Sequence, residues 1–241
     1  MKKIGVIFAG GVGSRMRSKG KPKQFLEVGG KPIIVHTVEI FQKAKIIDEI
    51  VIVILKDWQD EMNRLVEKFE LTKVKKIVPG GKTGQLSIFN GLEAAEELSM
   101  DDSDIVLIHD GVRPLINEEV LENNVKNVIE KGSAITTAPA KETVVLVNNE
   151  MDVESVVDRN QSYIAKAPQS FYLKDILGTH RLAMKEGITD SIDSSTLMGM
   201  YNKKLSIISG PYENIKITTP DDFYMFSALA DAKENAQIFG I

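Results

Sequence analysis

Glycines and cations gather near the start of the chain in a pattern that suits phosphate binding. The glycine-rich stretch AGGVG at 9–13 follows an apolar run at 4–9, and the cations Arg15 and Lys23 come soon after it. Glycines let backbone N–H groups approach phosphate oxygens closely and converge on an anion. The alternative is a structural turn with solvated basic residues. We interpret the segment as a phosphate-binding loop with its own cations.

Two better-known nucleotide motifs are excluded by single positions. A dinucleotide-binding loop needs a third glycine where this chain has Met16. A second glycine pair at 80–81 comes directly before Lys82 and resembles the end of a P-loop. A P-loop needs a glycine six residues before its lysine, and that position is Lys76 here. We interpret this pair as a second glycine turn before a helix, able to line a nucleotide pocket.

An acidic residue lies where a strand is expected to end. Asp110 follows the apolar run 105–108, and ligands of open α/β sheets bind at the carboxyl ends of their strands. A helix-capping aspartate is the alternative. The neighbouring His109 has no second histidine at metal-binding spacing, so we interpret it as a structural histidine.

The elements that must position these residues alternate between strands and helices. Nearly continuous apolar runs predict strands, and three- and four-residue apolar spacing predicts helices. The predicted strands are 4–9, 50–55, 74–78 and 105–108, and the predicted helices are 32–44, 58–69 and 85–98. This alternation predicts one α/β domain over 1–241, with a Rossmann-like, mostly parallel twisted sheet and helices on both faces.

The stretch at about 141–159 breaks this alternation. It predicts two strands around a turn at 148–149, a β-hairpin arm that projects from the body and exposes Val145 and Val147. We expect a partner subunit to cover them, which makes the arm a dimerisation element. An edge hairpin that lies on its own domain is the alternative. After the arm the chain is expected to return to helical spacing, and Thr219 followed by Pro220 opens a last helix.

Composition limits the classes of partner. The formal net charge of −4 disfavours a general nucleic-acid binder, and no apolar run reaches the roughly 20 residues that span a bilayer. The chain has no cysteine, which excludes disulfides, thiolate metal sites and cysteine nucleophiles. A cytoplasmic protein is the expectation.

Several separated motifs, taken together and in order, resemble one family. They are AGGVGSRM at 9–16, PKQF at 22–25, the glycine pair at 80–81 with Ser87, HDGVRP at 109–114, DRN at 158–160, PQSF at 168–171 and NIKITTP at 214–220. The chain is similar to the polyol-phosphate cytidylyltransferases, a family that comprises 2-C-methyl-D-erythritol 4-phosphate cytidylyltransferases and ribitol-5-phosphate cytidylyltransferases.

This resemblance implies a reaction and a nucleotide site. A phosphate oxygen of the acceptor attacks the α-phosphorus of CTP and releases pyrophosphate, so fixed cations are the main requirement. The resemblance implies catalytic roles for Arg15, Lys23 and Lys216, and Asp110 as the ligand of Mg²⁺. The implied nucleotide-binding residues are Ala9, Gly10, Gly11, Gly13, Gly81, Ser87 and Asp110.

The resemblance also implies an acceptor site shared between two subunits. Its residues would be Asp110, Arg113, Thr143, Arg159 and Thr189. Thr143 and Arg159 flank the predicted arm, so an exchanged arm would let them complete the site of the neighbour in a homodimer. Surface salt bridges are the alternative role.

Some positions depart from the family pattern. Lys82 and Gly84 stand where relatives usually have an acid and an arginine, and Ala167 replaces a threonine. The motifs favour ribitol 5-phosphate or a related pentitol phosphate, for teichoic acid or capsule synthesis. The alternatives are methylerythritol phosphate, for isoprenoid precursors, and more remotely a sugar 1-phosphate. A dinucleotide-dependent oxidoreductase is disfavoured by Met16, and a non-catalytic nucleotide-binding regulator remains open.

Overall fold

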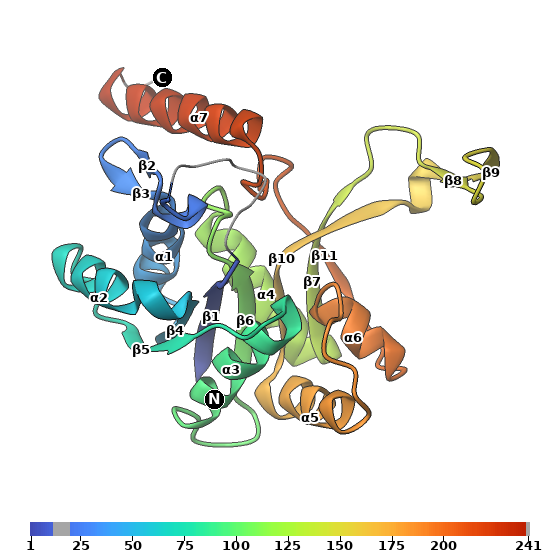
Figure 1. Ribbon diagram of the computed structural model, residues 1–241, viewed down its shortest axis with the longest axis horizontal. Helices are drawn as coiled ribbons and strands as arrows, with labels where there is room; N and C mark the ends of the chain where they lie inside the picture. The colour runs from blue at the N-terminus through green and yellow to red at the C-terminus, as the bar shows by residue number, and fades with distance from the viewer. Residues whose placement is uncertain (12–19, 240–241) are drawn as a thin grey trace.

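A seven-stranded sheet forms the centre of the protein. The computed structural model describes residues 1–11 and 20–239, with only the backbone described for 233–239. The strand order is β11-β7-β10-β6-β1-β4-β5, and all neighbours run parallel except β10, which is antiparallel to both β6 and β7 (Figure 1). The strands are β1 (Lys3–Ala9), β4 (Glu49–Ile54), β5 (Val74–Pro79), β6 (Ile105–Asp110), β7 (Ser133–Pro139), β10 (Tyr163–Tyr172) and β11 (Ile207–Ser209). The predicted strands and the mostly parallel sheet are therefore confirmed.

Helices cover both faces of this sheet because successive strand residues point to opposite sides. In β4, Ile50 and Ile52 pack with α1, α2 and α4, whereas Val51 and Val53 pack with α3, α5 and α6. The helices are α1 (Ile33–Lys43), α2 (Gln59–Lys68), α3 (Gly84–Glu96), α4 (Glu118–Lys131), α5 (Leu173–Lys185) and α6 (Ser194–Met200). The first three agree with the helices predicted from apolar spacing.

The expectation of helical spacing directly after the arm is wrong for β10. This strand is inserted between β6 and β7, and its polar side chains are buried rather than alternating with apolar ones. Each finds a partner: Ser170 Oγ donates to Asn124 Oδ1 at 2.8 Å, and Gln169 Nε2 donates to Asp193 Oδ2 at 2.9 Å. Such partners come from distant parts of the chain, so local pattern does not reveal them.

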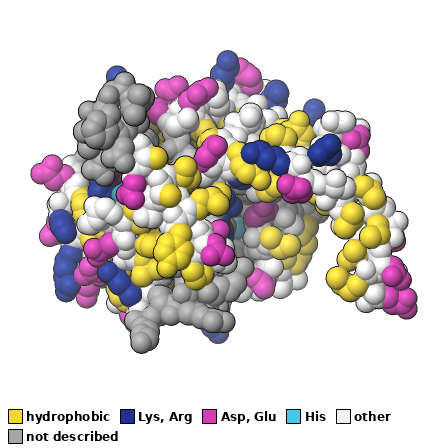
Figure 2. All heavy atoms as spheres, turned by 90° about the horizontal axis from the view of Figure 1, so that it is seen from above, with side chains coloured by type: hydrophobic (Ala, Val, Ile, Leu, Met, Phe, Trp, Pro, Cys, Tyr) yellow, Lys and Arg dark blue, Asp and Glu magenta, His cyan; other side chains and the backbone are white. Residues whose placement is uncertain are grey.

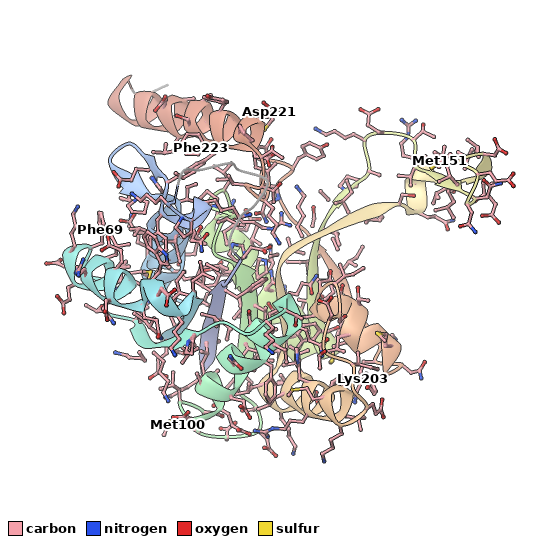
Figure 3. All side chains as sticks on the ribbon, in the orientation of Figure 1. Phe69, Met100, Met151, Lys203, Asp221 and Phe223 are labelled. Carbon is pink, nitrogen blue, oxygen red and sulfur yellow. The ribbon has the colours of Figure 1, made fainter. Side chains whose placement is uncertain are left out.

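The last helix, α7 (Pro220–Phe239), begins as predicted. The Asp222 carboxylate accepts from the Thr219 amide at 2.8 Å, and the Thr219 hydroxyl accepts from the Asp222 amide at 3.3 Å, which is a capping box. Phe226 in α7 packs with Val112 and Ile217, and thereby docks the helix beside the end of β6. Figure 3 labels Asp221 and Phe223 on this helix.

Smaller elements complete the chain. They are β2 (Glu27–Val28), β3 (Lys31–Pro32) and the short 3-10 helices η2 (Lys23–Phe25), η3 (Lys56–Trp58) and η4 (Arg159–Gln161). No helix in the described part of the chain is both long enough and apolar enough to cross a bilayer.

The predicted hairpin is present and stands away from the body. Its strands β8 (Val145–Val147) and β9 (Val153–Val156) pair only with each other among the described strands. Both strands are exposed along their whole length, with Leu146 at 53% and Val153 at 62%. Figure 2 shows hydrophobic side chains along the projecting arm, and Figure 3 shows Met151 at its tip. The alternative of a hairpin that lies on its own domain is therefore wrong.

Candidate functional site

Two glycine turns meet at the carboxyl ends of β1 and β5. A Cβ on Gly10 would lie 2.9 Å from Ser87 Oγ, and a Cβ on Gly80 would lie 3.2 Å from the Cα of Gly10, so side chains at these positions would force the turns apart. Ser87 Oγ accepts from the Gly81 amide at 3.0 Å and donates to the Thr83 carbonyl at 2.9 Å. The hydroxyl of Ser87 therefore holds the second turn in place beside the first.

A second loop is tied to this pair of turns. Thr83 caps α3 by accepting from the Leu86 amide, and its hydroxyl donates to the carbonyl of Thr189. The buried Gln85 donates to the Ile188 carbonyl at 2.7 Å and accepts from the Ser191 amide at 2.7 Å. The structure thus places the predicted acceptor residue Thr189 next to the glycine turns. Gln85 lies outside every family motif, so the sequence gives no signal for its role.

Lys23 lies at the same edge of the sheet. Its Nζ donates to the Ile217 carbonyl at 2.8 Å, which links it to the segment that carries Lys216. The adjacent Gln24 is buried, and its Nε2 donates to the carbonyls of Ala9 at 2.7 Å and Gly11 at 3.3 Å. Gln24 therefore joins the 3-10 helix η2 to the end of β1 and the start of the glycine loop. The predicted residues Gly13 and Arg15 lie outside the described residues.

Asp110, the last residue of β6, is the electrostatic centre of the site. It is only 6% exposed, and its carboxylate pairs with Lys216 Nζ at 2.6 Å and with Arg113 Nε at 2.7 Å. Burial raises the pKa of Asp110, but the positive charges and hydrogen bonds of Lys216 and Arg113 outweigh burial and hold that pKa well below its usual range. Asp110 is ionised at any working pH, and the helix-capping alternative is wrong.

The segment that carries Lys216 is anchored by contacts that sequence reasoning missed. The buried Asn214 accepts at its carbonyl from Arg113 Nη1 at 3.0 Å and from Lys166 Nζ at 3.2 Å. Its side-chain amide donates to the Ala167 carbonyl at 2.6 Å. In the sequence, Asn214 stands out only as part of a family motif and Lys166 does not stand out at all, because these contacts join positions about 50 residues apart.

His109 is a structural residue, as interpreted from sequence. Its Nε2 lies 3.1 Å from the Arg113 carbonyl, and its ring packs 5.2 Å from the ring of Phe41. Burial lowers the pKa of His109 to about 4, so the imidazole is neutral near pH 7. It supports the turn after Asp110 and carries no charge toward a phosphate.

Thr143 and Arg159 are not brought to Asp110 within one chain. Both side chains are exposed on the arm, where Arg159 Nη1 lies 3.4 Å from the carbonyl oxygen of Lys141. Among the described residues, no hydrogen bond or ion pair joins either of them to Asp110 or Lys216. The arm would have to reach another chain for these residues to act at a site of this kind.

The site offers a metal ion one carboxylate, from Asp110, rather than a full set of protein ligands. Among the side chains that the structure describes, in residues 1–11 and 20–232, no group of three or more His, Cys, Asp or Glu could hold a metal ion. Mg²⁺ is commonly bound by one or two carboxylates, with water and substrate phosphates as its other ligands. The ionised Asp110 beside the glycine turns is a ligand of that kind, and at present Lys216 pairs with its Oδ1 and Arg113 with its Oδ2.

Glycine turns at the carboxyl edge of a Rossmann-like sheet, with a buried carboxylate flanked by fixed cations, are suited to hold the phosphates of a nucleotide. The family model described as IspD, 2-C-methyl-D-erythritol 4-phosphate cytidylyltransferase, matches residues 4–232. The chain belongs to this family of cytidylyltransferases, which confirms the resemblance and the class of enzyme.

Individual relatives carry two different acceptor names. A ribitol-5-phosphate cytidylyltransferase of Streptococcus agalactiae serotype III is 69% identical, with 99% of each chain covered. A 2-C-methyl-D-erythritol 4-phosphate cytidylyltransferase of Clostridium acetobutylicum is 38% identical, with 93% of this chain and 95% of the relative covered. A crystal structure of 4-diphosphocytidyl-2C-methyl-D-erythritol synthase from Anaerococcus prevotii matches with a TM-score of 0.82, at 30% identity over 95% of this chain and 96% of that one.

Proposed function

We propose that the protein transfers CMP from CTP to ribitol 5-phosphate, giving CDP-ribitol and pyrophosphate. The choice of ribitol 5-phosphate as the acceptor is supported by the 69% identity to a relative named for ribitol 5-phosphate, against 38% to one named for methylerythritol phosphate. The transfer itself is supported by the cations that surround Asp110 beside two glycine turns. We propose a cytoplasmic location as well, because the reaction consumes CTP.

The residues have roles that follow from the charges in the reaction. A phosphate oxygen of the acceptor forms a bond to the α-phosphorus of CTP, the bond to the bridging oxygen of the β-phosphate breaks, and pyrophosphate leaves. Charge on the phosphate oxygens is stabilised by Lys23 and Lys216, with Arg15 as a further cation. Asp110 orients Lys216 and Arg113 and would hold Mg²⁺, which supplies further charge neutralisation when it is bound.

A pyrophosphate-release panel tests this proposal. CTP, UTP, ATP and GTP are each combined with ribitol 5-phosphate, methylerythritol 4-phosphate and glucose 1-phosphate, with and without Mg²⁺. The expected result is release with CTP and ribitol 5-phosphate that requires Mg²⁺. Preference for methylerythritol 4-phosphate would overturn the acceptor, and activity only with glucose 1-phosphate would overturn cytidylyl transfer to a polyol phosphate.

We further propose that two chains exchange arms and share acceptor sites. The support is the exposure of both arm strands and the position of Arg159 on the arm, away from Asp110. The bidentate guanidinium of Arg159 is suited to a substrate phosphate. Mixing inactive Asp110→Ala with inactive Arg159→Ala chains should restore activity, because one site of the mixed dimer then keeps both residues. Confirmed mixed dimers without activity would show that each site is built from one chain.

A further inference from the structure

An irregular stretch of β10 is hydrogen-bonded to the segment that carries Lys216. The pairing of β10 with β7 slips between Ala165 and Gln169, and Lys166 lies within this slip. Bulges of this kind re-aim side chains beside functional sites. Lys166 is 8% exposed, and its Nζ donates to the Tyr212 carbonyl at 2.7 Å and to the Asn214 carbonyl at 3.2 Å.

The segment that carries Lys216 contains no helix or strand between β11 and α7, so its position depends on individual contacts. Besides Lys166, these contacts include Arg113 Nη1, which donates to the Asn214 carbonyl at 3.0 Å, and the Ile217 amide, which donates to the Val112 carbonyl at 3.0 Å. Two residues beyond Asn214, Lys216 reaches Asp110 at 2.6 Å, and the next carbonyl, of Ile217, accepts from Lys23 at 2.8 Å. A shift of the backbone at 212–214 would therefore move Lys216 itself and the Ile217 carbonyl that accepts from Lys23.

A buried ammonium at this place has an unfavourable environment. Burial lowers the pKa of Lys166 and the positive charge of Arg113 lowers it further, while the negative charge of Glu213 raises it by less. Among the described residues, no carboxylate forms an ion pair with Lys166. An apolar side chain would fill the same space without that cost. The two carbonyl bonds are what the ammonium adds, since carbonyl oxygens accept strongly from a charged donor.

The Tyr212 ring connects the same segment to the base of the arm. Lys141 Nζ lies 3.5 Å from the centroid of the ring, and Lys166 Nζ lies 5.0 Å from it, which are both cation–π distances. The ring thus offers part of the compensation that a carboxylate would otherwise give to Lys166.

We propose that Lys166 is a positioning residue, whose bonds to the Tyr212 and Asn214 carbonyls fix the 211–217 segment so that Lys216 meets the substrate phosphates. The kinetic part of this inference rests on the proposed cytidylyl transfer. The structural part does not, because the order of the segment can be measured without substrate.

A double-mutant cycle tests the route through Lys216. Lys166→Met should lower kcat by roughly 10- to 100-fold, the scale of a misplaced group, and change the KM for CTP less. If Lys166 acts mainly through Lys216, adding Lys166→Met to Lys216→Ala should slow the enzyme by much less than Lys166→Met slows the wild type. Lys166→Arg, which keeps a charged donor, should recover much of the rate, and the exposed Lys174→Met is the matched control. Effects that multiply in the double variant would overturn the proposal.

Amide hydrogen exchange provides the readout that needs no activity. The Ile217 amide donates to the Val112 carbonyl at 3.0 Å, and it should exchange faster in Lys166→Met, while amides of β1 stay protected. Unchanged exchange at Ile217 would overturn the proposal whether or not the wild-type protein turns over CTP. Lys166→Gln is the second variant if Lys166→Met loses its thermal transition. A wild-type protein without cytidylyl transfer would refute the proposed function, and the exchange result would still decide the role of Lys166.

Discussion

His180, on α5, makes stability depend on pH in a way that the structure specifies. The ring is 1% exposed and stacks on Phe89 of α3 at 6.1 Å, and neither ring nitrogen has a hydrogen-bond partner among the described residues. Burial lowers the pKa of His180 from the ordinary value of 6.5 to about 4. The folded protein therefore keeps His180 neutral at pH values where the unfolded chain binds a proton.

The sign and size of the effect follow from linkage. The contribution of neutral His180 to stability is full above pH 6.5, is lost as the pH falls, and changes no further below about 4. The difference between these values, at about 1.36 kcal/mol per pH unit, corresponds to about 3 kcal/mol, with about 2 kcal/mol lost by pH 5. His180→Leu removes the titrating group and suits the apolar surroundings.

Urea denaturation between pH 7.5 and 5 measures this difference. The free energy of unfolding of the wild type should fall below that of His180→Leu by about 2 kcal/mol more at pH 5 than at pH 7.5. His109 titrates in both proteins, so its contribution cancels from the comparison. Curves for the two proteins that run parallel over this range would refute the assignment of acid sensitivity to His180.

Other substitutions test the site and the arm. Lys23→Ala should reduce kcat by roughly 10²-fold or more with an unchanged thermal transition, whereas the exposed Lys21→Ala should not, and equal rates would remove Lys23 from the chemistry. Gly81→Ala should weaken CTP binding in calorimetry because its Cβ would overlap a side chain of α3, while Gly84→Ala meets open space and should bind normally. Leu146→Asp places a charge on the apolar arm and should shift the protein toward monomer in analytical ultracentrifugation; an unchanged sedimentation coefficient would argue against an arm-mediated dimer.

The local residue pattern predicted those elements whose burial or capping is evident from their own residue types. The strands β1, β4 and β6 are buried on both faces or nearly so, and their apolar runs indicate this directly, whereas the edge strand β5 is only partly buried. The capping residues of α7 act within one turn, so Thr219 and Asp222 are visible as a signal. β10 was missed because its buried polar side chains are satisfied by partners far away in the chain.

The sequence alone determined the chemistry of the site, and the tertiary structure decided its arrangement. Glycines after a strand, an acid at a strand end and separated lysines indicated a phosphate site and a family, because residue type and spacing carry that information. Only the fold showed that Asp110 pairs with both Arg113 and Lys216. It also showed that Lys166 and Arg113 donate to the Asn214 carbonyl in the segment that carries Lys216. Apart from the Asp110–Arg113 pair, which is local, those contacts join residues about 50 to 100 positions apart, and their geometry exists only once the sheet has formed.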